Sequence, residues 1–289
     1  MTTPTTVGKS TKSIGDILVA DNRLSSADAI RITNYQEQHG IQFGAAGIEL
    51  ELLTKDDIDF ALARQFDYAY LGQQDTSLGP ELVAAYKPFS PAVENLRAIR
   101  SQLMLRWFNT DPLHKVIAVV SPDRLEGRTF VTANLGIVFT QQGQRTLLID
   151  ANLRTSPLTG LQNLFRLGKS AGLSGILSGR AGLEAAVPVT GLQGLFVLPA
   201  GTEPPNPQEL LGRPAFSKLL GEAARQFDVI LVDSPAGGDF ADAEIIAARA
   251  GAALMIARRN QSLMSKMVLL ANCLRENGVA LVGTLLNDG

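Results

Sequence analysis

The chain has 289 residues, of which 45% are hydrophobic and 19% charged, and its formal net charge at pH 7 is −2. This composition is typical of a globular protein, and the length allows one large core with a small domain attached. The near-neutral charge gives no reason to expect nucleic acid or an anionic membrane surface as a partner. No apolar run reaches the ~20 residues of a membrane-spanning helix, and the Thr-rich start lacks a signal-peptide core, so we expect a cytoplasmic protein.

We expect residues 1–12 to be a disordered tail and residues 13–71 to be a small, mainly helical domain built from a repeat. Residues 42–65 match residues 13–36, with Gly44 standing 29 positions after Gly15 and the apolar positions following at the same offset. A fixed period predicts two helix-turn-helix units packed on each other. Ser25 and Thr54, each followed three residues later by Asp, predict the starts of two helices.

Residues 72–90 mix turn-forming residues with one short apolar segment, which is typical of a linker. The apolar positions of residues 91–108 have helical spacing. From Lys115 onward, short apolar strands alternate with helical stretches; the expected strands are 115–120, 145–150, 195–200, 228–233, 252–257 and 280–287. This alternation predicts an α/β domain over residues 91–289, with a mainly parallel sheet flanked by helices and ligands at the carboxyl ends of its strands.

The segment Ser121–Thr129 has the position of a phosphate-binding loop, because it follows an apolar strand and precedes a helix. In such a loop the backbone N–H groups and the helix N-terminus bind phosphate, and a Ser or Thr after the usual Lys binds Mg²⁺. Thr129 fits the metal-binding position, whereas Arg128 stands where the Lys is expected and Pro122 where the first Gly is expected.

Two further strands deliver a carboxylate to the same edge of the predicted sheet. Asp150 ends the strand 145–150, with Asn152 and Arg154 just beyond, and Asp233 ends the strand 228–233 in the manner of a Walker B residue. The order of phosphate loop, Asp150 and Asp233 predicts a P-loop nucleotide site.

These motifs resemble those of the bacterial tyrosine kinases that control polysaccharide chain length, most closely the EpsG-type kinases. The resemblance covers about residues 80–289. It includes the Glu-x-x-Arg-x-x-Arg helix with Glu94, Arg97 and Arg100, the proline-rich turn at 198–211, the three Walker-type segments, and a last strand with Asn287 near adenine.

The resemblance implies binding of ATP with Mg²⁺ and transfer of a phosphoryl group to tyrosine. Thr129, Asp150 and Asp233 would hold the metal, Arg128, Asp150 and Asp233 would be catalytic, and Glu94, Arg97 and Arg100 would form a homo-oligomer interface. The partner would be a separate transmembrane regulator of polysaccharide chain length, through which the protein could associate with the membrane. The implied nucleotide-binding residues are Asp123, Arg124, Leu125, Glu126, Gly127, Arg128, Thr129, Phe130, Arg154 and Asn287.

Three departures from the family pattern leave other functions open. Arg128 replaces the Walker A Lys, Asn152 replaces an expected carboxylate, and the C-terminal tyrosine cluster is missing, so that Tyr86 is the one internal acceptor in the kinase-like domain. One alternative is a pseudokinase scaffold that uses nucleotide for assembly. The other is a partitioning ATPase. Such proteins carry a second Lys at the start of the loop, and neither Ser121 nor Pro122 supplies it.

The N-terminal repeat resembles the N-terminal domain of type II secretion ATPases, some of which bind cyclic di-GMP. The Arg that opens each family motif is replaced by Ser13 and Gln42, and the central Gly by Asn22 and Glu51. The domain is also acidic, which disfavours an anionic ligand. We therefore expect a docking or spacer role for this domain, without cyclic di-GMP.

Overall fold

The computed structural model describes residues 13–65, 71–72, 75–154 and 160–288. The chain forms two compact units, Met1–Gly72 and Gln73–Gly289. The tail predicted for residues 1–12 lies outside the described residues. Within the described ranges, no helix is both long and apolar enough to cross a lipid bilayer.

The N-terminal unit contains two copies of one helix-turn-helix structure. Helices α1 and α3 begin 29 positions apart, and so do α2 and α4. The turn within each copy has one residue in the left-handed region, Asn22 with φ 57° and Glu51 with φ 55°. The predicted helix starts are present, since the Ser25 hydroxyl accepts from Asp28 N at 3.0 Å and that of Thr54 from Asp57 N at 3.3 Å. The bounds are α1 (Ile14–Ala20), α2 (Ser26–His39), α3 (Phe43–Glu49) and α4 (Lys55–Gln65).

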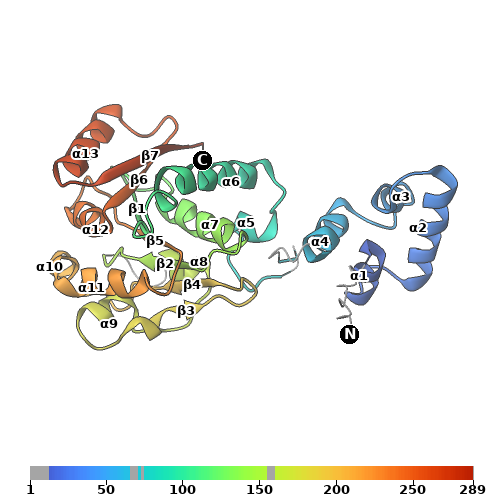
Figure 1. The fold of residues 1–289 in the computed structure, drawn as a ribbon, viewed down its shortest axis with the longest axis horizontal. Helices are drawn as coiled ribbons and strands as arrows, with labels where there is room; N and C mark the ends of the chain where they lie inside the picture. The colour runs from blue at the N-terminus through green and yellow to red at the C-terminus, as the bar shows by residue number, and fades with distance from the viewer. Residues whose placement is uncertain (1–12, 66–70, 73–74, 155–159, 289) are drawn as a thin grey trace, which may run out of the picture. The chain divides into compact units, whose positions relative to one another are not determined.

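The larger unit is built on one seven-stranded sheet in the order β3-β4-β2-β5-β1-β6-β7 (Figure 1). All neighbouring strands are parallel except the antiparallel pair β3 and β4. All six predicted strands are present, and the two-residue β3 was too short to be predicted. The bounds are β1 (Val116–Val120), β2 (Thr146–Asp150), β3 (Val187–Pro188), β4 (Leu195–Leu198), β5 (Val229–Asp233), β6 (Ala252–Arg258) and β7 (Ala280–Asn287).

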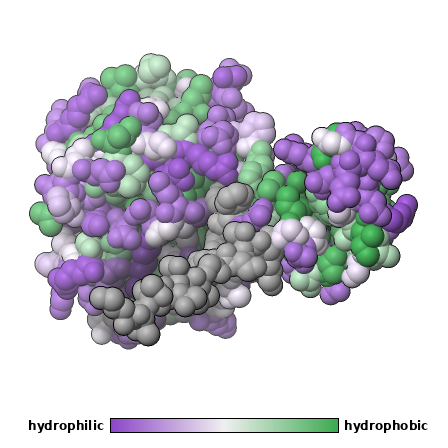
Figure 2. All heavy atoms as spheres, turned by 45° about the vertical axis from the view of Figure 1, so that its right-hand side comes forward, coloured by the Kyte–Doolittle hydropathy of each residue, from purple (hydrophilic) through white to green (hydrophobic). Residues whose placement is uncertain are grey.

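Helices cover both faces of this sheet, as predicted (Figure 1). The group α5 to α8 lies on one face, and α9 to α13 pack their apolar side chains with the strands on the other. The bounds are α5 (Val83–Tyr86), α6 (Pro91–Leu103), the π-helix η1 (Met104–Phe108), α7 (Arg128–Thr140), α8 (Gly160–Leu164), α9 (Gly172–Leu177), the 3₁₀ helix η2 (Leu183–Ala185), α10 (Pro207–Gly212), α11 (Pro214–Ala223), α12 (Asp242–Ala250) and α13 (Met264–Glu276). On the face of the molecule seen in Figure 2, hydrophilic side chains predominate on both units.

Residues 75–90, which the sequence analysis assigned to a linker, pack against α7 in the structure. The Asn134 side chain accepts from Ala84 N at 2.9 Å and donates to Glu81 O at 3.1 Å. The Tyr86 hydroxyl is buried, where it accepts from Leu78 N and donates to Leu78 O, both at 3.0 Å. The short apolar segment between the turn formers therefore belongs to the core, and Tyr86 is not presented as a phosphate acceptor.

Candidate functional site

The phosphate loop lies between β1 and α7, at the carboxyl edge of the sheet. Leu125 and Gly127 have positive φ values of 62° and 97°, which curl the backbone before α7 begins at Arg128. The φ of Gly127 favours glycine, and a Cβ atom there would displace the side-chain amide of Asn287. The N-terminus of a 13-residue helix then faces the loop and favours an anion.

The half-buried Thr129 and the buried Asp233 and Asp150 form one cluster at the base of this loop. The Thr129 hydroxyl donates a 2.6 Å hydrogen bond to Asp233 Oδ2. Asp150 and Asp233 are paired in register on the adjacent strands β2 and β5. Asp150 accepts hydrogen bonds from Asn152 N at 3.2 Å and Leu161 N at 3.1 Å. Three residues predicted from separate segments are thus brought together.

Burial makes both carboxyls weak acids, and the charge of Asp233 adds to this effect at Asp150. Burial, which is the larger cause, and the charge of Asp233 together raise the pKa of Asp150 to about 7, against the hydrogen bonds from Leu161 N and Asn152 N. Burial also raises the pKa of Asp233 to about 6, against the hydrogen bond from Thr129 and the charge of Arg128, which lower it. Ionisation of both carboxyls at once is unfavourable in this buried place unless a cation lies between or beside them.

The cluster fits a Mg²⁺ ion that also binds phosphate. Asp233 Oδ1 is buried and has no hydrogen-bond partner among the described residues. Together with the Thr129 hydroxyl it offers oxygen donors, which Mg²⁺ prefers. The described residues contain no group of three or more His, Cys, Asp or Glu side chains that could cage a metal by themselves. Mg²⁺ usually completes its shell with water and substrate phosphate, so this small donor set suffices.

Arg128 directs its guanidinium into the base of the loop. Nε donates to Ser234 O at 2.9 Å, and Nη1 donates to Asp123 O at 2.6 Å and to the Ser121 hydroxyl. Burial lowers the pKa of this guanidinium, while the charges of Asp233 and Glu126 oppose that effect. The residue in the Lys position therefore ties the start of the loop to the end of β5.

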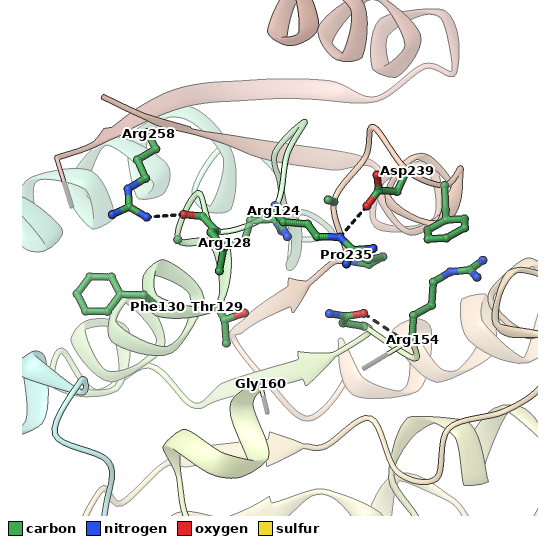
Figure 3. Close-up of a pocket in the computed structure, with 14 residues that line it drawn as sticks. Arg124, Arg128, Thr129, Phe130, Arg154, Gly160, Pro235, Asp239 and Arg258 are labelled. Carbon is green, nitrogen blue, oxygen red and sulfur yellow. Dashed lines mark hydrogen bonds and ion pairs between the residues drawn. The ribbon is translucent and has the colours of Figure 1, made fainter. Parts of the chain in front are cut away.

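A cavity of about 530 Å³ opens above the loop, and most of the predicted nucleotide-binding residues line it (Figure 3). This volume is suited to a nucleotide-sized ligand. Of the predicted residues, Arg124, Leu125, Gly127, Arg128, Thr129, Phe130 and Arg154 line the cavity. Residues that were not predicted complete it: Asn152, Gly160, Pro235, Ala236, Asp239, Phe240 and Arg258.

Arg154 is fixed on the same side of the cavity as Asp239 (Figure 3). Its guanidinium donates to both carboxylate oxygens of the fully buried Asp242, at 2.6 and 3.0 Å. It also lies 3.7 Å from the centroid of the Phe240 ring. A bidentate ion pair and a ring contact hold this cation in one place.

Asp123 and Glu126 are in the loop, but their side chains bind the α13 side and do not line the cavity. Lys266 Nζ lies 2.7 Å from Asp123 Oδ1, and the Ser262 hydroxyl donates to Glu126. Glu126 also accepts from Asp123 N at 2.7 Å, so this backbone N–H of the loop is already hydrogen-bonded within the loop. These two side chains shape the loop from outside.

Asn287 lies beside the loop at the end of β7, where it donates to Glu126 O at 3.1 Å. Its register partner Arg258 ends β6 and lines the cavity. The strand predicted for 252–257 ends one residue before β6 does, so Arg258 was not among the predicted site residues. The signal was nevertheless present, since a polar residue at a strand end is the pattern that identified Asp150 and Asp233.

The predicted interface residues lie on α6. Glu94 and Arg97 form an i, i+3 ion pair of 2.8 Å, in which the Glu94 side chain is 71% exposed. Arg97 also donates to Pro88 O at 2.7 Å, and Arg100 donates to Val138 O at 3.2 Å. Both arginines thus donate to backbone carbonyls of their own chain, whereas the Glu94 side chain is mostly exposed and bonded to Arg97.

Comparison with known proteins identifies relatives of this chain. The chain is 32% identical over 211 residues to the tyrosine-protein kinase wzc of Salmonella typhimurium, and 33% identical over 205 residues to the tyrosine-protein kinase etk of Escherichia coli K12. These matches cover 72% and 71% of this chain and 28% of each relative, so the chain spans just over a quarter of their length. None of the models of known protein families matches the chain.

A solved structure agrees with these relatives. The kinase domain of the Escherichia coli tyrosine kinase ETK is 30% identical, with a TM-score of 0.68, over 74% of this chain and 82% of that domain. The α/β fold with a P-loop between β1 and α7 agrees with this match. The chain therefore belongs to the bacterial tyrosine kinase family.

Proposed function

We propose that the protein binds MgATP and phosphorylates tyrosine in a partner that takes part in exopolysaccharide synthesis and export. The cluster of Thr129, Asp233 and Asp150 at a nucleotide-sized cavity carries this proposal. Family membership supports the same reaction.

The residues of the cluster suit distinct tasks in phosphoryl transfer. MgATP supplies the γ-phosphoryl group and a metal charge that offsets the charge on the phosphates. Thr129 and Asp233 would hold the metal through the hydroxyl and the unpartnered Oδ1. Asp150, with its pKa raised to about 7, would take the proton of the tyrosine hydroxyl as the oxygen bonds to phosphorus and ADP departs.

The experiment is transfer from γ-labelled ATP by the full chain, with Mg²⁺ and the cytoplasmic tail of the candidate partner. We expect labelled phosphotyrosine with the unchanged protein and a loss of about a hundredfold with Asp233→Asn, because one metal-binding charge disappears. Thr129→Ser keeps the hydroxyl and serves as the matched control for Thr129→Val, which removes it. Transfer that is insensitive to Asp233→Asn and Thr129→Val contradicts the proposed site.

A scaffold that binds nucleotide without transfer is the second candidate, and the placement of Arg128 favours it. The guanidinium is engaged with Ser234 O, Asp123 O and the Ser121 hydroxyl. Asn152 also offers no charge beside Asp150. Tight ATP binding with no labelled tyrosine in the same assay would support the scaffold.

Assembly and partner are parts of the same proposal. We propose that Glu94, Arg97 and Arg100 contact a neighbouring copy, with the exposed Glu94 as the first contact. The activating partner would be a separate transmembrane regulator, and the kinase would act on the cytoplasmic side. Glu94→Lys should lower the mass of the assembly in analytical ultracentrifugation, whereas an unchanged mass contradicts this interface.

For the N-terminal unit we propose a docking or spacer role. Residues 13–65 carry nine Asp and Glu and four Lys and Arg, which disfavours a doubly anionic ligand. Calorimetric titration with cyclic di-GMP should give no binding heat.

A further inference from the structure

We propose that Gly79 and Arg166 are positioning residues for phosphoryl transfer. Through these two residues the segment 76–79 holds the C-terminal end of α8, and α8 fixes the carboxylate of Asp150. This inference rests on the proposed function and deepens it, because it names residues outside the cavity on which the proposed base depends.

The carboxylate of Asp150 is oriented by two backbone N–H groups. Oδ1 accepts from Asn152 N at 3.2 Å, and Oδ2 accepts from Leu161 N, in α8, at 3.1 Å. The torsion that turns an Asp carboxylate about its own axis has broad minima, so hydrogen bonds decide where its two oxygens point. The orientation of Oδ2 therefore depends on where α8 lies.

The beginning of α8 fits closely against this oxygen. Gly160, the first residue of α8, has a φ of 73°, and a Cβ atom there would collide with Asp150 Oδ2. Gly160 also lines the cavity (Figure 3). Glycine thus lets the helix approach the carboxylate, and a movement of α8 away from β2 would lengthen the bond from Leu161 N.

The other end of α8 is bonded to a segment that is distant in the sequence. Gly79 N donates to Leu164 O at 2.7 Å. Gly79 is buried, and a Cβ atom there would lie 2.9 Å from Leu164 O and 3.3 Å from Leu164 Cα. Both of these are backbone atoms, so a side chain at position 79 requires that α8 and the segment 76–79 move apart.

Arg166, two residues beyond α8, has a backbone conformation that favours glycine. Its φ is 47°, and its Nη1 donates to Thr76 O. A residue other than glycine keeps such a conformation only where other contacts hold it. The bond to Thr76 O is one such contact, and glycine could not make it. Gly79 and Arg166 therefore supply two bonds between one segment and the end of α8.

The segment 76–79 is itself fixed in the core of the larger unit. Leu78 is buried, and its backbone N and O are both bonded to the buried Tyr86 hydroxyl at 3.0 Å. The buried side chains of Leu161 and Phe165 also hold α8, but apolar packing has no preferred direction. The directional bonds from the segment therefore set the position of α8 along its axis.

The test measures kcat for transfer from γ-labelled ATP to the partner's tail, and ATP affinity by calorimetry, with the full chain. Gly79→Ala places a Cβ atom against the backbone of Leu164. Gly168→Ala is the matched control, because a Cβ atom at the exposed Gly168 meets nothing within 4 Å. Arg166→Met removes the donor to Thr76 O at an exposed position that the fold should tolerate, and Arg166→Lys keeps a cationic donor.

We expect Gly79→Ala to lower kcat by about tenfold or more while ATP affinity stays within about twofold, since the base is displaced and the phosphate loop is not. Arg166→Met should lower kcat by about threefold or more, and Arg166→Lys should recover most of that loss. Amide hydrogen exchange in residues 160–164 should accelerate by about tenfold in Gly79→Ala. Gly168→Ala should change none of these quantities.

A double substitution distinguishes positioning from general destabilisation. In Asp150→Asn the proposed base is already absent, so the addition of Gly79→Ala should lower the residual rate by less than about twofold. A loss as large as that in the unchanged background would mean that Gly79 acts independently of Asp150, and would overturn the inference.

Two further results would overturn the inference and leave the proposed function standing. One is an unchanged kcat in both Gly79→Ala and Arg166→Met. The other is an equal loss of kcat and ATP affinity in Gly79→Ala, which would indicate a disturbance of the whole cavity. If the unchanged protein transfers no phosphoryl group to tyrosine, the proposed function itself fails and the positioning role falls with it.

Discussion

Asp150 and Asp233 occupy register-paired positions at the ends of two adjacent parallel strands, both almost fully buried. Parallel pairing brings neighbouring strand ends to one edge, so two carboxyls that are 83 residues apart in sequence share one enclosed place. Each of them is costly to ionise there without a cation.

The pH dependence of stability should reveal this pair. Because burial raises both pKa values above the ordinary 3.8, to about 7 and about 6, the folded protein holds these protons more tightly than the unfolded chain. The stability that the pair contributes is complete below about pH 4 and is lost as the pH rises to about 7. We expect the ligand-free protein to lose about 2 kcal/mol or more between pH 5 and pH 8, in urea unfolding.

The control for this prediction is Asp150→Asn, which cannot ionise. It should flatten the pH profile and be more stable than the unchanged protein at pH 8. An unchanged protein that is equally stable at pH 5 and pH 8, with no effect of Asp150→Asn on the profile, would refute the elevated pKa values.

Substitutions of Arg128 should distinguish its role in holding the loop from its role in binding phosphate. Arg128→Ala removes a cation and leaves Ser234 O and Asp123 O without their donor, so we expect ATP affinity to fall by about tenfold or more. Arg128→Lys restores a compact ammonium at the Walker A position, and we expect it to increase transfer to tyrosine. Calorimetry and the labelled-ATP assay measure the two effects. Wild-type affinity in Arg128→Ala would show that the guanidinium has no part in the site.

Tyr86 should not become phosphorylated, because its hydroxyl is buried and bonded to both backbone groups of Leu78. Tyr86→Phe leaves these groups unsatisfied and should lower the free energy of unfolding by about 1–3 kcal/mol. Tyr35→Phe, at a half-buried position in the N-terminal unit, is the control and should cost about 0.5 kcal/mol or less. Mass spectrometry that finds phosphate on Tyr86 after incubation with ATP would contradict this expectation.

Asn134 should hold α5 on α7. Asn134→Ala removes the partners of Ala84 N and Glu81 O, so amide hydrogen exchange in residues 79–86 should accelerate by about tenfold or more. Thr132→Val is a matched control on the same helix, since Thr132 is buried and its hydroxyl has no partner among the described residues. Equal protection of α5 in both variants would mean that apolar packing alone holds the segment.

The sequence allowed the sheet and the proximity of Thr129, Asp150 and Asp233 to be predicted because both leave local signals. Strands β1, β2 and β5 are continuous apolar runs with full burial, and Asp150 and Asp233 directly end two of them. Since parallel strands end at a common edge, their proximity to Thr129 followed from the order of the segments. The repeat likewise predicted paired helices in the N-terminal unit.

The remaining features depend on contacts that no local pattern encodes. The bond of Lys266 to Asp123 joins residues 143 positions apart, and the ion pair of Arg154 with Asp242 joins residues 88 positions apart. Helix α5 spans only four residues, too few for a periodic pattern, so its residues were assigned to a linker. Arg128 could be identified as unusual, but its three acceptors became known only from the fold.

Helix α7 carries Thr129 in its first turn and Asn134 in its second, on the side where α5 is bound. A displacement of the chain from residue 75 onward would therefore act on the helix whose N-terminus lies at the phosphate loop. A shift of α7 would change the position of the Thr129 hydroxyl relative to Asp233, and with it the arrangement of the oxygen atoms proposed to bind a metal ion.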